Sequence, residues 1–392
     1  MRTARVLMFA NGDLGQLHTF LFAIIAIFFG QPVAAQAPSP AKAIDFEQHG
    51  QFAEAVQVWK EVTERNPHDA AAFASLGIDL SREAKYSEAA EAYKSALALN
   101  ASLPGIPLDL GLAEFKQGHF EAAIAPLKTV CRQNRSSAQA CTLLGMSYYG
   151  TRRFGEAIRY LDPLVRSDPE NVELREVLAQ SCLQAKNYSC AEKQFTKIVE
   201  QQPDSAAAHM LMGEALDGLQ RDREAITEFQ EAAKVSPAEA NVHFGLGYLY
   251  WKTRQYDDAK REFEAELKVD ASNPQALAYL GDIELKKEDL DGAIVLLKKA
   301  LAAKNDLRVA AFDLGVAYTQ EKNYGEGEGA LKRAIELDPS QPDAHYRLAR
   351  VYQAMGKTAE AKKEFDEVSR LHRKEDEPLA SKIQAAPPPL PQ

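Results

Sequence analysis

The chain has 392 residues, of which 46% are hydrophobic and 26% are charged, and its formal net charge is −10. This composition is typical of globular proteins, so it excludes a collagen-like chain, a wholly disordered chain and a multi-span membrane protein. The 56 acidic residues outnumber the 46 basic ones, and no run of Lys and Arg makes a phosphate-binding stripe. Nucleic acid is therefore a poor candidate partner.

The first 35 residues have the pattern of a secretory signal peptide. Arg2 and Arg5 precede the apolar stretch 19–30, and residues 33–35 (Val-Ala-Ala) form a cleavage motif. The apolar stretch is shorter than the roughly 20 residues that span a bilayer. We therefore predict export to a periplasmic or extracellular location, with no membrane span after cleavage. The alternative is a chain tethered to the membrane by an uncleaved N-terminal segment.

An internal repeat of 34 residues runs through the rest of the chain. Ten small residues recur at this spacing without insertion or deletion: Ala43, Gly77, Gly111, Gly145, Ala179, Gly213, Gly247, Gly281, Gly315 and Ala349. Twelve residues after each lies a second Gly or Ala, and four residues after that lies a large apolar residue, from Trp59 to Phe365. The repeat units start near residues 36, 70, 104, 138, 172, 206, 240, 274, 308 and 342.

This pattern predicts two helices in each unit. Gly inside a helix costs about 1 kcal/mol relative to Ala, so we expect it only where a neighbouring backbone approaches closely. The large residue lies one turn beyond the second small residue on the same face, where it fills the space beside the crossing. Proline recurs in a further column, for example at Pro203 and Pro237, and ends the second helix.

The order of small residue, Leu or aromatic residue, Ala, aromatic residue and Pro resembles the tetratricopeptide repeat family, most closely over residues 241–270. The resemblance implies an all-α fold, a right-handed superhelical α-solenoid of antiparallel helix pairs. It covers residues 36–375, as ten tandem units. Residues 376–392 are charged and then rich in proline, which predicts a disordered tail.

The resemblance also implies a concave groove that the first helix of each pair lines. The residues assigned to it lie three before, one after or four after the small residue of the first column. They are Phe115, Met146, Tyr149, Glu176, Glu214, Asp217, Phe244, Tyr248, Trp251, Phe312 and Tyr346, and the same columns include Asp282. The alternative is that some of these side chains pack between adjacent first helices.

Two apolar patches in this set, around Phe115 and Tyr149 and around Tyr248 and Trp251, flank an acidic stretch. An extended protein or peptide segment with apolar and basic residues fits such a groove, because the acidic stretch attracts positive charge.

Catalytic and metal-binding motifs are not found in the sequence, which contains no P-loop, HExxH, CxxC or GxSxG pattern. We predict no enzymatic activity, no catalytic residues, no cofactor and no metal. His209, His243 and His345 share one repeat column, but equivalent residues of neighbouring units are too far apart to bind one zinc ion. We expect these imidazoles to pack in the core between repeats.

The four cysteines, Cys131, Cys141, Cys182 and Cys190, suggest disulfides in an exported chain. The first two flank the turn between two units, and the last two flank the turn within one unit. We predict bridges between Cys131 and Cys141 and between Cys182 and Cys190, because each pair spans a helical hairpin. The alternative is four free thiols that pack as small apolar residues.

Together these features favour an exported, non-enzymatic scaffold that binds protein partners in its concave groove. A different class of function also fits: an accessory subunit of an envelope export or polysaccharide-assembly machine that holds a glycan or an outer-membrane component. A third hypothesis is an array that regulates an enzyme encoded elsewhere. The sequence leaves the oligomeric state open.

Overall fold

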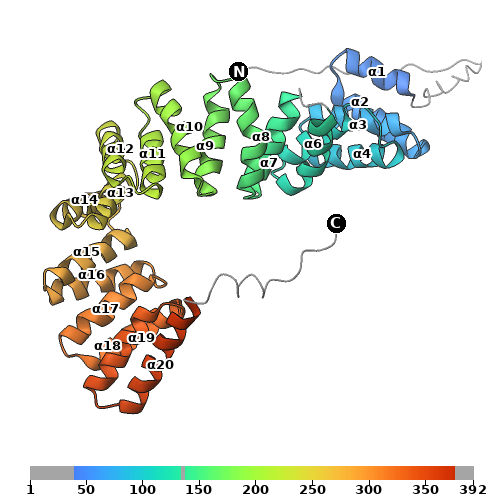
Figure 1. The fold of residues 1–392 in the computed structure, drawn as a ribbon. Helices are drawn as coiled ribbons and strands as arrows, with labels where there is room; N and C mark the ends of the chain where they lie inside the picture. Colours follow the sequence, from blue (N-terminus) through green and yellow to red (C-terminus); the bar gives the residue numbers. More distant parts are fainter. Residues whose placement is uncertain (1–38, 134–136, 376–392) are drawn as a thin grey trace, which may run out of the picture. The chain divides into compact units, whose positions relative to one another are not determined.

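The computed structural model describes residues 39–133 and 137–375, which form helices joined by short turns and contain no strand (Figure 1). Within each compact unit, successive helices pack against each other in antiparallel pairs, so the expectation of an all-α solenoid is confirmed. The predicted signal peptide and the predicted C-terminal tail lie outside the described residues. None of the helices in the described ranges is both long and apolar enough to cross a membrane.

The chain divides into two compact units, and the first ends at Ala101. The helices described in the first unit are α1 (Pro40–Gln48), α2 (Phe52–Arg65), α3 (Ala70–Arg82) and α4 (Tyr86–Leu99). Its core holds a polar cluster, in which Nε1 of Trp59 donates a hydrogen bond to Glu47 at 2.8 Å. Asp79 is fully buried beside them, and burial together with the charge of Glu47 raises the pKa of Asp79 to about 7.

The second unit starts at Ser102 and contains the remaining helices of the described residues. They are α5 (Ile106–Lys116), α6 (Phe120–Gln133), α7 (Ala138–Gly150), α8 (Phe154–Ser167), α9 (Val172–Gln184), α10 (Tyr188–Gln201), α11 (Ala206–Gly218), α12 (Asp222–Val235), α13 (Val242–Lys252), α14 (Tyr256–Val269), α15 (Pro274–Lys286), α16 (Leu290–Ala303), α17 (Arg308–Gln320), α18 (Tyr324–Leu337), α19 (Pro342–Ala354) and α20 (Thr358–Glu375). Odd-numbered helices are the first helices of the repeats, and even-numbered helices are the second.

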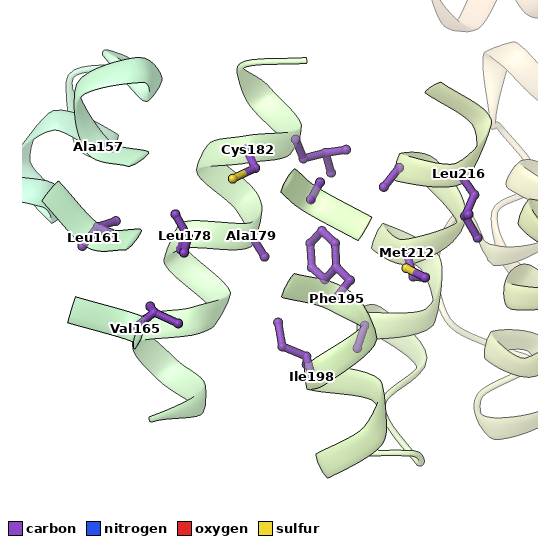
Figure 2. Close-up of a cluster of buried hydrophobic side chains, with 14 of the residues drawn as sticks. Ala157, Leu161, Val165, Leu178, Ala179, Cys182, Phe195, Ile198, Met212 and Leu216 are labelled. Carbon is purple, nitrogen blue, oxygen red and sulfur yellow. The ribbon is translucent and has the colours of Figure 1, made fainter. Parts of the chain in front are cut away.

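The repeating columns of small and large residues form the core. A Cβ atom added to Gly247 would lie 2.7 Å from Cδ1 of Phe263, and one added to Gly281 would lie 2.6 Å from Cγ of Leu297. The large side chain of each second helix therefore fills the space that the small residue of the first helix leaves. Figure 2 shows the same packing around Phe195, whose ring lies among side chains of α9 and α11.

The turn inside each repeat has a left-handed residue two positions before its second helix. Three repeats use glycine there: Gly50, Gly118 and Gly356. The other seven place a side chain in this conformation, with φ between 56° and 64°: Ala84, Arg152, Lys186, Gln220, Arg254, Glu288 and Lys322. Because left-handed backbone is unfavourable for residues with a Cβ atom, each of these turns carries a small local cost in free energy.

The turn between repeats is held by a polar clamp that recurs along the second unit. Nδ1 of His209 lies 2.7 Å from Oε2 of Glu228, and its Nε2 lies 3.0 Å from the carbonyl oxygen of Pro203. His243 repeats both contacts one repeat later, at 2.7 Å and 3.0 Å. One repeat earlier Arg175 occupies the same column and donates to the carbonyl oxygen of Pro169 at 2.6 Å. His209 and His243 thus each tie the turn before their repeat to a second helix.

The two predicted cysteine pairs meet across their helical hairpins. Cys131 of α6 and Cys141 of α7 are joined by a disulfide with their Cα atoms 5.2 Å apart. Cys182 of α9 and Cys190 of α10 are joined with their Cα atoms 5.6 Å apart. Both separations suit a disulfide, so the backbone can hold the bridges without rearrangement.

Oxidation of the cysteines remains a prediction with a direct test. We expect the intact mass of the purified protein to increase by four hydrogen atoms on reduction, since two bridges would each take up two. Cys190 is more exposed than the other three cysteines, so alkylation after mild reduction should label the pair of Cys182 and Cys190 first. A mass that reduction leaves unchanged would mean free thiols.

Candidate functional site

The residues assigned to the groove all lie on first helices of the second unit. They are Phe115 on α5, Met146 and Tyr149 on α7, Glu176 on α9, Glu214 and Asp217 on α11, Phe244, Tyr248 and Trp251 on α13, Phe312 on α17, and Tyr346 on α19. None of these side chains is fully buried, and Tyr346 is 48% exposed. These side chains therefore remain accessible to solvent.

Hydrogen bonds across this surface join the first helices of successive repeats. The hydroxyl of Tyr149 on α7 donates to Oε1 of Gln180 on α9 at 2.8 Å. Nε1 of Trp251 on α13 donates to Oδ2 of Asp282 on α15 at 2.5 Å. In both cases the residue four after the small position bonds the residue one after the small position of the next repeat. Some side chains of the surface thus also contact the adjacent first helix, which is the alternative given above for part of this set.

Five aromatic residues gather around α13 and α15, and we call them the aromatic cluster: Phe244, Tyr248, Trp251, Phe263 and Tyr279. Tyr279 lies at their centre. Its ring centroid is 4.9 Å from that of Trp251, 5.9 Å from that of Tyr248 and 6.0 Å from that of Phe244. Its ring also stacks on buried Phe263 at 5.4 Å. Such packing fixes the orientation of the rings that reach solvent.

The sequence-based prediction missed Tyr279. Burial, followed by the neighbouring Tyr248 hydroxyl and the charges of Asp282 and Asp313, raises the pKa of Tyr279 to about 12. Its column lies two residues before the small position, which the groove columns do not include. A usable signal was present, because this column is charged in three other repeats, at Asp109, Asp313 and Arg347.

Two carboxylates lie beside the aromatic cluster, and we call Asp282 and Asp313 the carboxylate pair. Asp282 forms an ion pair with Lys286, whose Nζ lies 5.6 Å from the ring centroid of Trp251. Asp313 on α17 is 8% exposed. Burial and the negative charge of Asp282 raise the pKa of Asp313 to about 7, although Lys286 and Arg308 oppose this shift.

The acidic stretch is partly neutralised within the structure. Nζ of Lys252 lies 2.7 Å from Oδ1 of Asp217 and 2.7 Å from Oδ1 of Asp222. Glu214 is exposed, yet the surrounding protein and the charge of Asp217 raise the pKa of its carboxyl. The carboxylate charge that this surface offers to a partner is therefore smaller than the sequence alone indicates.

A shallow hollow of about 630 Å³ lies at the last repeat and includes two of the assigned residues. Its lining consists of Phe312, Pro342, Asp343, Tyr346, Arg347, Val368 and His372. The described residues contain no group of three or more His, Cys, Asp or Glu placed to hold a metal ion.

Two family models, both described as tetratricopeptide repeat, match the chain. One covers residues 148–215 and 318–386, and the other covers 41–104, 75–138, 213–257 and 244–308. The chain belongs to the tetratricopeptide repeat family. No match was found among curated proteins.

Solved structures of similar fold include other proteins with tandem helix pairs. A chain of the APC/C hetero-tetramer Cut9-Hcn1 aligns over 87% of this tetratricopeptide repeat chain and 81% of its own length, with 14% identity and a TM-score of 0.50. MamA aligns over 43% of this chain and 98% of its own, with 20% identity and a TM-score of 0.39. YrrB, described as a tetratricopeptide repeat protein with an unusual peptide-binding site, aligns over 45% and 91%, with 22% identity and a TM-score of 0.39.

Proposed function

We propose that this tetratricopeptide repeat protein is an exported, non-enzymatic scaffold that binds a protein partner on the surface of its first helices. The main contact is the exposed side of the aromatic cluster, at Tyr248 and Trp251. The observation that carries the proposal is the convergence of these rings on Tyr279, with centroid distances of 5.9 and 4.9 Å. Rigid, partly exposed aromatic side chains are the usual anchors of protein interfaces.

The rest of the surface supports an extended partner. Partly exposed aromatic residues occur on α5, α7, α13, α17 and α19, so apolar contacts are available at intervals along the second unit. Acidic side chains lie between them on α9 and α11. A polypeptide with alternating apolar and basic residues matches this sequence of contacts better than an acidic one.

Export is part of the proposal and rests on the sequence of residues 1–35. The predicted disulfides fit the same compartment, because disulfides persist in the oxidising periplasm and outside the cell.

The test is cross-linked affinity capture from the envelope of the native host. The mature protein is compared with a Tyr248→Ala/Trp251→Ala variant, and we expect the variant to lose specific proteins that the wild type recovers. Tyr250→Ala is a matched control on the same helix, because the Tyr250 hydroxyl accepts a hydrogen bond from Gln230 of α12 at 2.9 Å, away from Tyr248 and Trp251. Circular dichroism confirms that each variant is folded.

Recovery of the same proteins by wild type and double variant would contradict binding through the aromatic cluster. Recovery of no protein, with retention of envelope polysaccharide that resists high salt, would favour the second class of function, in which sugar rings stack on the aromatic residues. Peptide binding through charged contacts should instead weaken as the salt concentration increases.

A further inference from the structure

Asp313 is an acidic side chain that is more than nine-tenths buried and has no partner. Within residues 39–133 and 137–375, no group forms a hydrogen bond or ion pair with its carboxylate. Four buried polar atoms in this part of the chain are fully enclosed without a hydrogen bond, on Asp79, Arg175, Arg308 and His345, and none belongs to Asp313. Its oxygen atoms therefore keep contact with solvent at the surface of the first helices.

The cations near Asp313 are already engaged elsewhere. Lys286 forms an ion pair with Asp282, and Arg308 forms an ion pair with Asp343. The charges of these two ion pairs sum to zero, so no nearby cation is left to neutralise the carboxylate of Asp313. A buried carboxylate without a cationic or hydrogen-bonding partner is unfavourable, and a ligand that supplies positive charge relieves this cost.

The neighbours of Asp313 determine which cation fits. Asp313 occupies on α17 the repeat position that Tyr279 occupies on α15, and α15 packs against α17. The charge of Asp313 also acts on the Tyr279 hydroxyl, and Asp282 lies on the same helix as Tyr279. Asp282 in turn accepts the hydrogen bond of Trp251. The site thus combines the unpaired carboxylate of Asp313 with the rings of the aromatic cluster.

We propose that Asp313, with the neighbouring rings of Tyr279 and Trp251, forms a subsite for the guanidinium group of an arginine in the partner polypeptide. A guanidinium is planar, donates two parallel hydrogen bonds to carboxylates and stacks on aromatic rings, whereas an ammonium is a compact point charge. The proposal rests on the proposed function and deepens it, because it names the side chain that the scaffold recognises.

Acidification should weaken this binding. The proton that Asp313 takes up near neutral pH must leave before a guanidinium can pair with it, since protonation removes the charge. The titratable and charged groups that face Asp313 are Tyr279, Asp282 and Lys286 of α15, Arg308 of α17 and Asp343 of α19. Among the carboxyl groups of this set, Asp282 and Asp343 have cationic partners, so Asp313 is the one expected to govern the pH dependence near neutrality.

The experiment uses a synthetic heptapeptide, acetylated and amidated, with a central arginine between two leucines on an alanine background. The chain has two tryptophans, Trp59 and Trp251, so a Trp59→Phe background leaves Trp251 as the fluorescent reporter. We expect saturable binding of the arginine peptide, and binding about tenfold weaker when citrulline replaces arginine. Asp313→Asn should weaken arginine binding by about the same factor and remove its pH dependence between about pH 6 and pH 8.

Asp109→Asn is the matched control. Asp109 on α5 occupies the same repeat column as Asp313 and is partly buried, but it lies outside the subsite. It should leave binding unchanged. Equal binding of the arginine and citrulline peptides, full binding by Asp313→Asn, or no binding by the wild type would each overturn the proposal.

A lysine peptide that binds as tightly as the arginine peptide would also contradict the guanidinium assignment. The outcome for the proposed function can be distinguished from the outcome for the subsite. If the Tyr248→Ala/Trp251→Ala variant loses its captured proteins while Asp313→Asn keeps them, the scaffold function stands and the subsite is wrong.

Discussion

Replacement of Phe263 by Ala should lower the free energy of unfolding by about 3–5 kcal/mol, one of the largest effects available in this chain. The Phe263 side chain is fully buried, fills the space beside Gly247 and stacks on Tyr279 with ring centroids 5.4 Å apart. Its removal leaves a cavity between α13 and α15. The same loss should disorder the rings of the aromatic cluster and weaken partner binding.

Leucine at the same position is the matched control for this prediction. The repeat column already holds Leu297 and Leu331 in later repeats, so Phe263→Leu should cost only about 1 kcal/mol. Urea denaturation followed by circular dichroism measures both variants. Hydrogen exchange should localise the weakening to α13–α15, because each repeat is stabilised mainly by its neighbours. Equal stability of the Ala and Leu variants would contradict this account.

Asp313→Asn should stabilise the free protein at alkaline pH by about 4 kcal/mol. The pKa of Asp313 in the folded protein is raised to about 7 from an ordinary value of 3.8, chiefly by burial. Below about pH 4 the group is neutral in both states and makes no difference. As the pH rises towards 7 the unfolded chain ionises first, the folded chain holds more protons, and stability falls. Above about pH 7 the cost is constant.

Urea denaturation at several pH values checks this sign. The stability gained by Asp313→Asn should grow by about 2–3 kcal/mol between about pH 5 and pH 8. Asp217→Asn is a suitable comparison, because Asp217 has Lys252 as an ion-pair partner 2.7 Å away and its amide variant should not gain stability in this way. A gain for Asp313→Asn that does not change with pH would show that its carboxyl titrates normally.

The fold could be predicted from the sequence because its information is local and repeated. The small residue and the large residue sixteen positions later each recur ten times along one period, and a proline recurs five times. The packing of Phe263 against Gly247 follows from that period alone. The pairing of cysteines followed from the same register, because each pair flanks a predicted turn.

The site could be predicted only in part. The groove columns found Trp251 and Tyr248 but passed over Tyr279 and Asp313, which lie one position outside them. Whether that position faces a neighbouring helix or the solvent depends on how closely two first helices approach. The 34-residue repeat length does not determine that distance. Of the two ion pairs that leave Asp313 uncompensated, Lys286 with Asp282 lies within α15, whereas Arg308 with Asp343 joins two repeats and is not visible in the local sequence.

The seven side chains held in left-handed turns allow the stability of single repeats to be changed without changing the core. They are Ala84, Arg152, Lys186, Gln220, Arg254, Glu288 and Lys322, one in each of seven repeats. Because glycine relieves the backbone cost at any one of them without altering a packed surface, single repeats can be strengthened selectively. Protein engineers could use these positions to choose which repeat of the array opens first under mechanical load.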